Sequence, residues 1–454
     1  MAIATINPAT GATLKSFEAE SHAVVDGKID QAAAAWADWR LRPIGERAGM
    51  LNQLAGVLDS RRDEWARLAT LEMGKPIGAA RAEVEKCAFV CRHYAEQAER
   101  YLADETIESG ASRSWVAYQP LGPVLAVMPW NFPYWQVFRF AAPATAAGNV
   151  GLLKHASNVP GCAVAIEDVF REAGYPEGVF QSLLVPSDVV ADVVADDRVR
   201  AATLTGSGPA GRSVASIAGE HLKKTVLELG GSDPFVVLDD ADVEAAAETG
   251  AWARNLNGGQ SCIAAKRFVV QDSVYDEFAA RFVEEVESLV VGDPMDGDTQ
   301  VGPQARRDLM ETLHGQVEAS VEAGATVLTG GEPMDREGSF YPPTVLADVP
   351  AGCPADSEEV FGPVAALFRV GDEDEAVEKA NDTEFGLGAS VWSQDRERGE
   401  RVAAGLDAGC TYVNQLVKSD PRVPFGGVKE SGYGRELGEA GIKEFVNRKT
   451  VWVE

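Results

Sequence analysis

Hydrophobic residues recur with a helical period over the N-terminal part of the chain. From about Ala23 to Leu102 the apolar positions repeat with this period, and Gly74-Lys75-Pro76 separates two long runs. The second run predicts an amphipathic helix over Ile77 to Leu102. The segment Arg113 to Gln119 then alternates apolar and polar residues, which predicts a strand with one face in water.

After residue 120 the pattern changes to short apolar strands that alternate with helical segments. The first such region has strands at Val124–Met128, Gly151–Leu153, Phe180–Val185, Ala201–Leu204 and Phe235–Leu238. A second alternating region begins at Lys266–Val270 and continues through Val283–Val290, Thr326–Leu328 and Val364–Phe368. The last residues predict a terminal strand over Phe445–Val453. This alternation is typical of α/β proteins with parallel sheets covered by helices on both faces.

The composition is that of a globular protein with an acidic surface. Of the 454 residues, 45% are hydrophobic and 24% are charged, which excludes wholesale disorder. The formal net charge is −29, so nucleic acid and anionic membrane surfaces would repel the protein. The acidity fits either a well-solvated surface or one adapted to high salt, where ions screen the self-repulsion.

Membrane insertion and secretion are not expected. The most apolar region, Leu121 to Leu153, is interrupted by Arg139 and several prolines and is not a membrane span. The N-terminus from Met1 to Pro8 has neither a basic run nor an apolar core, so we do not expect a signal peptide. A soluble cytoplasmic protein is therefore expected.

The six cysteines are too sparse for a disulfide scaffold. Cys87 and Cys91, with His93 close by, raise the alternative of a zinc site, but tetrahedral zinc needs further ligands at suitable spacing. Since Val84, Cys87 and Cys91 fall on one face of the predicted helix, a buried pair of thiols is favoured and no metal is expected.

A glycine-rich segment, Gly206-Ser-Gly-Pro-Ala-Gly211, follows a predicted strand and precedes a helix. This is the context of a dinucleotide site, because glycines allow a phosphate to approach and the helix N-terminus offers free N–H groups. Taken alone, the motif would make Glu228 the ribose-binding acid. A tight turn without a ligand explains such a motif equally well.

Cys262 lies in a setting that none of the other cysteines shares. The segment Asn255-Leu-Asn-Gly-Gly-Gln-Ser-Cys262 puts it on a turn rich in glycine and small polar residues. Backbone donors and helix ends stabilise a thiolate, so this setting favours a nucleophile. An inert cysteine beside a turn is the alternative.

Two further segments carry side chains suited to acyl chemistry. Glu228 lies between Leu227 and Leu229, where partial burial would raise its pKa towards that of a general base. Asn131, in Pro129-Trp-Asn-Phe-Pro133, could donate its amide N–H to a developing oxyanion. A glutamate in a salt bridge and a proline-rich turn are the respective alternatives.

Together these segments identify a family. The chain resembles the aldehyde dehydrogenase superfamily over essentially its whole length, from Asn7-Pro-Ala-Thr-Gly11 onward. The spacing between Glu228 and Cys262 is also that of the family. The matching motifs, in family order, are Pro129-Trp-Asn-Phe-Pro133, Leu227-Glu-Leu-Gly-Gly231, Gly259-Gln-Ser-Cys262, Glu359-Val-Phe-Gly-Pro363 and Pro424-Phe-Gly-Gly-Val-Lys-Glu-Ser-Gly432.

The resemblance implies three catalytic roles. Cys262 would attack the aldehyde carbon, and Asn131 with the backbone N–H of Cys262 would stabilise the oxyanion of the thiohemiacetal. After hydride transfer to a nicotinamide, Glu228 would activate the water that hydrolyses the thioester. This assignment makes Glu228 the general base, and the ribose must be bound elsewhere.

The resemblance also implies the cofactor contacts. Glu359 and Phe361 match the residues at the nicotinamide ribose and ring, and Gly206-Ser207 matches the pyrophosphate turn. Trp130 and Leu229 match further cofactor-binding positions.

The ribose segment, Lys154-His-Ala-Ser157, departs from the usual pattern. The family usually has a glutamate where this chain has Ser157. A carboxylate would repel a 2′-phosphate, whereas serine can donate to it and Lys154 supplies positive charge. We therefore predict NADP as the preferred cofactor, with NAD possible. The alternative is that Ser157 merely leaves space for a water molecule beside the ribose of NAD.

Within the superfamily the chain resembles the short succinate-semialdehyde dehydrogenases. The supporting strings are Leu153-Lys-His-Ala-Ser-Asn-Val-Pro160 and Ser419-Asp-Pro-Arg-Val-Pro-Phe-Gly-Gly427. The resemblance implies that Arg139 and Ser419 bind the substrate carboxylate. Better-studied members carry another arginine shortly before the nucleophile, where this chain has Leu256. Arg139 could alternatively pair with an acidic neighbour.

The expected reaction is the oxidation of succinate semialdehyde to succinate. The alternatives are a dehydrogenase for general aliphatic aldehydes or other ω-oxo acids, a CoA-acylating relative and a structural relative without activity. The resemblance implies a Rossmann-like cofactor-binding domain, a second α/β catalytic domain and a small β bridging element. We place the cofactor-binding domain at residues 1–105 and 120–230 and the catalytic domain at residues 231–425. We place the bridging element at residues 106–119 and 426–454. The open edge of the terminal strand favours a homodimer or homotetramer.

Overall fold

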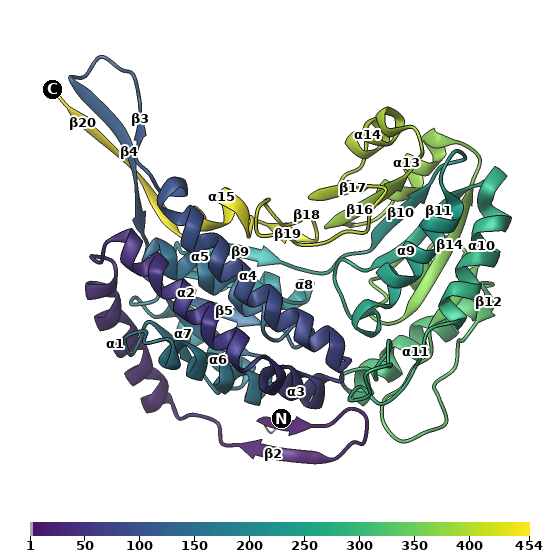
Figure 1. Ribbon diagram of the computed structural model, residues 1–454, viewed down its shortest axis with the longest axis horizontal. Helices are drawn as coiled ribbons and strands as arrows, with labels where there is room; N and C mark the ends of the chain where they lie inside the picture. Colours follow the sequence, from purple (N-terminus) through teal and green to yellow (C-terminus); the bar gives the residue numbers. More distant parts are fainter. Residues whose placement is uncertain (1–2) are drawn as a thin grey trace.

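The structure is a computed structural model that describes residues 3–454. Its two large sheets, each flanked by helices, form the two halves of the molecule (Figure 1). Met1 and Ala2 fall within two predictions: the cofactor-binding domain is predicted to include them, and no signal peptide is expected at this N-terminus. They lie outside the described residues.

The first sheet has six strands in the order β19-β9-β8-β5-β6-β7. All are parallel except β19, which pairs antiparallel with β9. The strands are β5 (Pro123–Met128), β6 (Val150–His155), β7 (Phe180–Ser182), β8 (Ala201–Thr205), β9 (Lys224–Glu228) and β19 (Gly432–Tyr433). Because parallel strands end at a common edge, the segments after Met128, His155, Thr205 and Glu228 meet there.

The second sheet has seven strands in the order β12-β13-β14-β11-β10-β16-β17. Only the β12–β13 pair is antiparallel. The strands are β10 (Asp233–Val237), β11 (Ala265–Gln271), β12 (Thr326–Thr329), β13 (Thr344–Ala347), β14 (Val364–Val370), β16 (Gly388–Trp392) and β17 (Cys410–Val413). The division into domains stays a prediction. Strand β19 lies within the predicted bridging element, and it pairs with the first sheet.

The expected strand at Val283–Val290 is wrong. Helix α10 (Asp272–Glu287) continues through most of this stretch and ends in a turn. Phe278, Phe282 and Val286 are buried along one face of α10, at a spacing of four residues. This helical period governs the segment, although its valines also favour a strand locally.

Helices cover both faces of each sheet (Figure 1). Those of the first half are α1 (His22–Trp39), α2 (Ile44–Ser60), α3 (Arg62–Met73), α4 (Ile77–Tyr101), α5 (Trp135–Ala147), α6 (Pro160–Glu172), α7 (Val190–Ala195) and α8 (Gly208–Glu220). Those of the second half are α9 (Val243–Asn255), α10, α11 (Arg307–Glu322), α12 (Pro354–Ser357), α13 (Glu373–Asn381) and α14 (Arg396–Ala404), and α15 (Gly438–Ile442) packs against α5.

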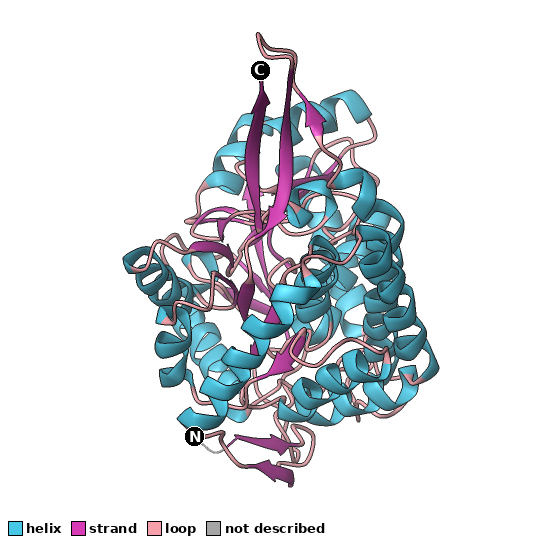
Figure 2. Cartoon of the chain, turned by 90° about the vertical axis from the view of Figure 1, so that its left-hand side faces the viewer, coloured by secondary structure: helices cyan, strands magenta, loops and turns pink. Residues whose placement is uncertain are grey.

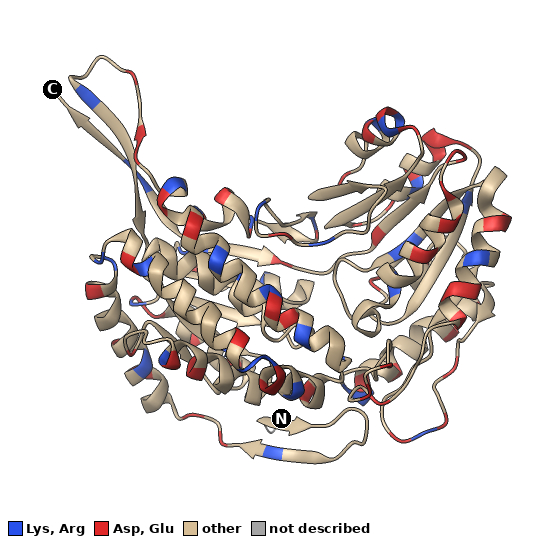
Figure 3. Ribbon diagram, in the orientation of Figure 1, with Lys and Arg blue, Asp and Glu red and all other residues tan. Residues whose placement is uncertain are grey.

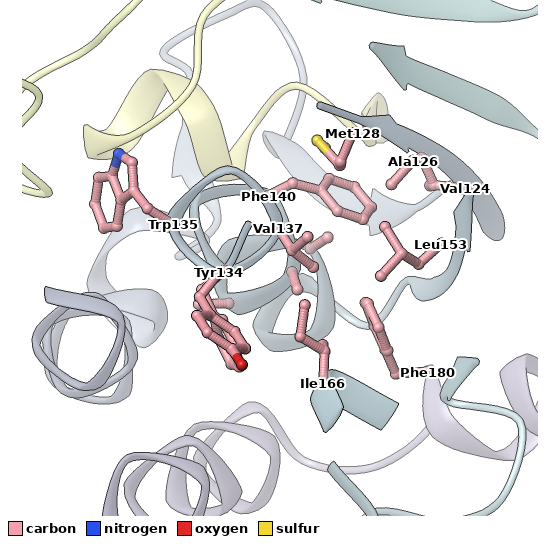
Figure 4. Packing of buried hydrophobic residues seen from close by; sticks show 14 of the residues in the cluster. Val124, Ala126, Met128, Tyr134, Trp135, Val137, Phe140, Leu153, Ile166 and Phe180 are labelled. Carbon is pink, nitrogen blue, oxygen red and sulfur yellow. The ribbon is translucent and has the colours of Figure 1, made fainter. Parts of the chain in front are cut away.

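Helix α5 forms the centre of the largest core. Every residue of α5 is buried, as expected for a helix that is largely apolar on all sides. Figure 4 shows Val137 and Phe140 of this helix near Val124 and Leu153 of the sheet. The loop of residues 129–134 connects β5 to α5. Because both elements are packed in the core, the core holds this loop in place.

Three smaller sheets complete the fold. β20 (Val446–Val453), β4 (Arg113–Pro120) and β3 (Glu105–Thr106) form an antiparallel sheet that projects from the body (Figures 1 and 2). The other pairs are β1 (Ile3–Ile6) with β2 (Thr13–Phe17), and β15 (Phe385–Gly386) with β18 (Val428–Lys429).

Acidic and basic residues are distributed over the helices and loops of both halves (Figure 3). Within residues 3–454, no helix has the length and apolar character needed to cross a membrane. Cys87 and Cys91 on α4 are fully buried in the core, and burial raises the pKa of both thiols. The part of the chain that the structure describes contains no cluster of three or more side chains suited to hold a metal ion.

Candidate active site

A cavity of about 450 Å³ lies between the two halves of the molecule. Helices α4 and α5 form one wall, and segments of the second half form the other. Cys262 lines this cavity and is half-buried. Arg139 and Ser419 line the same space.

The loop before Cys262 has a backbone that few sequences can adopt. Asn257, Gly258 and Gly259 have φ angles of 58°, 63° and 73°, in the left-handed region that favours glycine and asparagine. A Cβ on Gly259 would lie 2.2 Å from the carbonyl carbon of Gly362, so no larger residue fits there. The glycines recognised in the sequence are therefore required by this turn.

Asn131 is tied to the same loop. Its Nδ2 donates to the Gln260 carbonyl over 3.1 Å, while Asn257 Nδ2 donates to the Asn131 carbonyl over 2.7 Å. An amide nitrogen carries two hydrogens, so the second N–H of Asn131 is free for an oxyanion. The structure thus brings Asn131 and the Cys262 loop together, although their strands belong to different sheets.

Lys266, which is not among the predicted site residues, holds the other side of the turn. Its Nζ donates to the carbonyls of Cys262, Ser261 and Ala264 over 2.8, 3.1 and 3.2 Å. The only sequence signal is a lysine four residues after the cysteine, which by itself indicates nothing. Burial raises the pKa of the Cys262 thiol to about 12, although Arg139 and Lys266 act in the opposite direction. The resting sulfur is therefore protonated.

Glu228 lies at the end of β9 with 2% of its surface exposed. Burial raises the pKa of its carboxyl group well above the usual value, and Glu436 adds repulsion while Arg139 opposes both. Among the described residues, Oε1 of Glu228 has no hydrogen-bond partner. A buried carboxylate with a free oxygen and a raised pKa is a stronger base than an exposed one and can accept a proton from water.

The predicted phosphate-binding turn lies at the common strand edge. Ser207 precedes helix α8, and its side chain makes no capping hydrogen bond. The N–H groups at the start of α8 are thus available to an anion. A Cβ on Gly211 would lie 2.7 Å from Leu229, so the third glycine allows α8 to pack closely on the segment after β9.

Lys154, near the end of β6, and Ser157, just after the strand, lie at the same edge. Lys154 is buried, burial lowers its pKa, and it has no carboxylate partner within residues 3–454. Ser157 is half-buried in the turn that follows. An unpaired ammonium, a hydroxyl and a free helix N-terminus together fit the phosphates of a dinucleotide.

The remaining predicted cofactor residues come from both halves. Glu359, in the loop before β14, accepts a hydrogen bond from Gly231 N over 2.9 Å and lies 3.7 Å from Lys266 Nζ. The rings of Trp130 and Phe361 meet edge to face with centroids 5.9 Å apart. These contacts join the loops of the first sheet to those of the second.

Arg139 has an acidic partner, which is the alternative to a role in substrate binding. Its guanidinium forms an ion pair with Glu436, donates to Thr205 Oγ1 over 3.3 Å and stacks on Phe425 at 4.9 Å. Only 2% of Arg139 is exposed. Its charge is therefore largely committed within the protein.

The comparisons with known proteins agree with one another. The family described as "Aldehyde dehydrogenase family" matches residues 1–451. A probable succinate-semialdehyde dehydrogenase (NADP⁺) of Synechocystis sp. is 56% identical over 100% of both chains. A succinate-semialdehyde dehydrogenase (NADP⁺) of Mycobacterium avium is 52% identical over 100% of this chain and 97% of its own.

The solved structures have the same fold over the whole chain. The structure reported under "Structural insights into cofactor and substrate selection by Gox0499" has a TM-score of 0.99 at 41% identity, with 100% of both chains covered. The succinic semialdehyde dehydrogenase from Streptococcus pyogenes, in complex with NADP⁺ as the cofactor, has a TM-score of 0.97 at 37% identity, with 99% of each chain covered. The predicted fold class and family are confirmed, and the chain belongs to the aldehyde dehydrogenase family.

Proposed function

We propose that this protein oxidises succinate semialdehyde to succinate and prefers NADP to NAD. The observation that carries the proposal is the Cys262 sulfur in the wall of an open cavity that basic side chains also line. The names of relatives at 52% and 56% identity support the substrate and the cofactor. The residue roles below are part of the proposal.

The proposed reaction begins at Cys262. The Cys262 thiol gives its proton to water in the cavity, its Sγ bonds to the aldehyde carbon, and the C=O π electrons move to the oxygen, which takes up the negative charge. The free N–H of Asn131 and the backbone N–H of Cys262 donate to that oxygen. A nicotinamide cofactor, when bound, would supply the acceptor for the hydride that leaves the substrate carbon. Glu228 then takes a proton from the water that hydrolyses the thioester on Cys262.

The proposed cofactor site uses the edge of the first sheet. The start of α8 binds the pyrophosphate, and Glu359 with Phe361 and Trp130 position the nicotinamide end. Lys154 and Ser157 bind the 2′-phosphate of NADP, since both can donate and neither repels an anion.

A purified sample tests the proposal directly. Reduced-cofactor formation is measured with succinate semialdehyde and with butanal, each with NADP and with NAD. We expect the highest kcat/KM with succinate semialdehyde and NADP. Equal or better values with butanal would contradict the substrate, better values with NAD would contradict the cofactor, and a requirement for CoA would contradict hydrolysis.

Replacing Ser157 tests the cofactor assignment. Ser157→Glu should lower kcat/KM with NADP by at least about tenfold, because the new carboxylate and the 2′-phosphate carry like charges and repel each other. The value with NAD should hold or rise. Ser157→Ala is the matched control and should cost less, since it removes a hydroxyl without adding charge. A similar loss with both cofactors in Ser157→Glu would argue against a 2′-phosphate contact.

We further propose that the chain forms a homodimer or homotetramer through its projecting sheet and acts in the cytoplasm. The support for assembly is the sheet of β20, β4 and β3, which stands away from the body (Figure 2). Trp452 and Val453 of β20 and Ile107, directly after β3, expose large apolar side chains. Exposed apolar residues on an open sheet are suited to a subunit contact.

A further inference from the structure

Lys86 differs from the other basic side chains buried in the cavity wall. Lys75 forms an ion pair with Glu83, and Arg139 forms one with Glu436. Lys86, on α4, is half-buried and has no carboxylate partner within residues 3–454. Leu256, on the opposite wall, contributes no charge. The cavity therefore holds one partly buried ammonium whose charge no carboxylate contact balances.

Lys86 is held in position by two neighbours. Its Nζ donates to Ser419 Oγ over 2.8 Å and lies 4.1 Å from the centroid of the Trp135 ring. An ammonium group has three hydrogens, and only the one directed to Ser419 has an acceptor among the described residues. Two N–H donors of Lys86 thus stay available in the cavity.

Ser419 is also arranged as a donor. Its oxygen accepts from Lys86 Nζ and from Trp135 Nε1, the second over 3.0 Å. A hydroxyl oxygen has two lone pairs, and both are taken by these bonds. Its own hydrogen has no acceptor among the described residues, so it is free to donate to a ligand. Lys86 and Ser419 together present donors of the kind that binds a carboxylate.

We propose that Lys86, with Ser419, binds the carboxylate end of the substrate and that Lys86 determines the preference for an anionic aldehyde. The inference rests on the proposed function, because it names the recognition of succinate semialdehyde in the same cavity. The aldehyde end lies at Cys262, on the wall that the second half contributes.

The electrostatic setting supports this role. Burial and, to a smaller extent, the charge of Arg139 on α5 lower the pKa of Lys86 to about 8, although Cys87 and Glu83 on α4 and Asp420 beside Ser419 act in the opposite direction. Asp420 is already bound by Arg422 over 2.6 Å. A bound substrate carboxylate would stabilise the ammonium. The cation binds the carboxylate, so affinity for an anionic aldehyde should fall as the pH rises above about 8.

The experiment compares two aldehydes of similar length, succinate semialdehyde and butanal. Lys86→Met should raise KM for succinate semialdehyde by about 10–100-fold and leave kcat and the KM for butanal nearly unchanged. Lys86→Arg should restore much of the affinity. Lys418→Met is the matched control, because Lys418 is an exposed lysine at the same cavity. It should leave both KM values nearly unchanged.

A pH series on the unmodified protein gives a second measurement, which does not depend on whether the Lys86→Met variant folds. KM for succinate semialdehyde should rise above pH 8 while KM for butanal stays level, and Lys86→Arg should remove this rise. An equal change of KM for both aldehydes in Lys86→Met, or no change for either, would overturn the inference. Failure of the unmodified protein to prefer succinate semialdehyde would instead contradict the proposed function.

Discussion

Cys262→Ala is expected to abolish aldehyde oxidation, with kcat reduced by at least about 10⁴-fold. The substitution removes the thiol that bonds to the aldehyde carbon, so hydride transfer cannot begin. The turn around residue 262 is held by Lys266 and by the glycines before it, and the substitution should leave the fold intact. Initial rates with succinate semialdehyde and NADP, together with the melting temperature, measure the effect.

Cys410→Ala is the matched control for this prediction. Cys410 is also a half-buried thiol, and it begins strand β17 with its Sγ directed to the Leu387 carbonyl at 3.6 Å. It has no proposed role, so its replacement should keep most of the activity. Activity that persists in Cys262→Ala, or that depends equally on the two thiols, would contradict Cys262 as the nucleophile.

Glu228→Gln is expected to lower steady-state kcat by about 10²–10⁴-fold through slow hydrolysis of the thioester. Glutamine has nearly the same shape but cannot take a proton from water. The first turnover should still occur, so rapid mixing should show a burst of about one reduced cofactor per site. The burst followed by slow turnover separates acylation from hydrolysis within one experiment.

The pH dependence gives a further measure of the same residue. Burial raises the pKa of Glu228, and only the ionised carboxylate can act as a base. In the unmodified protein kcat should therefore fall as the pH is lowered through this raised pKa, and in Glu228→Gln the dependence should vanish. Loss of the burst along with turnover would contradict a role confined to hydrolysis.

The local pattern of the chain predicted much of the fold. Val124–Met128 lies within β5 and Val364–Phe368 within β14, because short apolar runs between turn residues are typical of buried parallel strands. Val283–Val290 was misassigned, because its apolar residues also fit one face of α10. Such ambiguity is resolved by what the segment packs against, and the local sequence does not contain that information.

The motifs predicted which residues belong to the candidate site, and the fold explains why motifs far apart in the sequence meet. Asn131 follows β5 and Cys262 precedes β11, so the two lie in loops of different sheets that hydrogen bonds join. Glu228 ends β9, which lies in the same sheet as β5. The chemistry assigned to these residues stays a prediction until the variants above are measured.

Residue type and spacing along the chain were enough for the family, the alternation of strands and helices and the acidic charge, because each depends on neighbours in sequence. The electrostatic state of the cavity was not accessible in this way. Arg139 is paired because Glu436 is folded against it, and Lys86 contacts Ser419 across 333 positions of sequence. Whether a buried cation is neutralised or free for a ligand depends on which distant side chains come within hydrogen-bonding distance and how much water remains, and folding alone sets both.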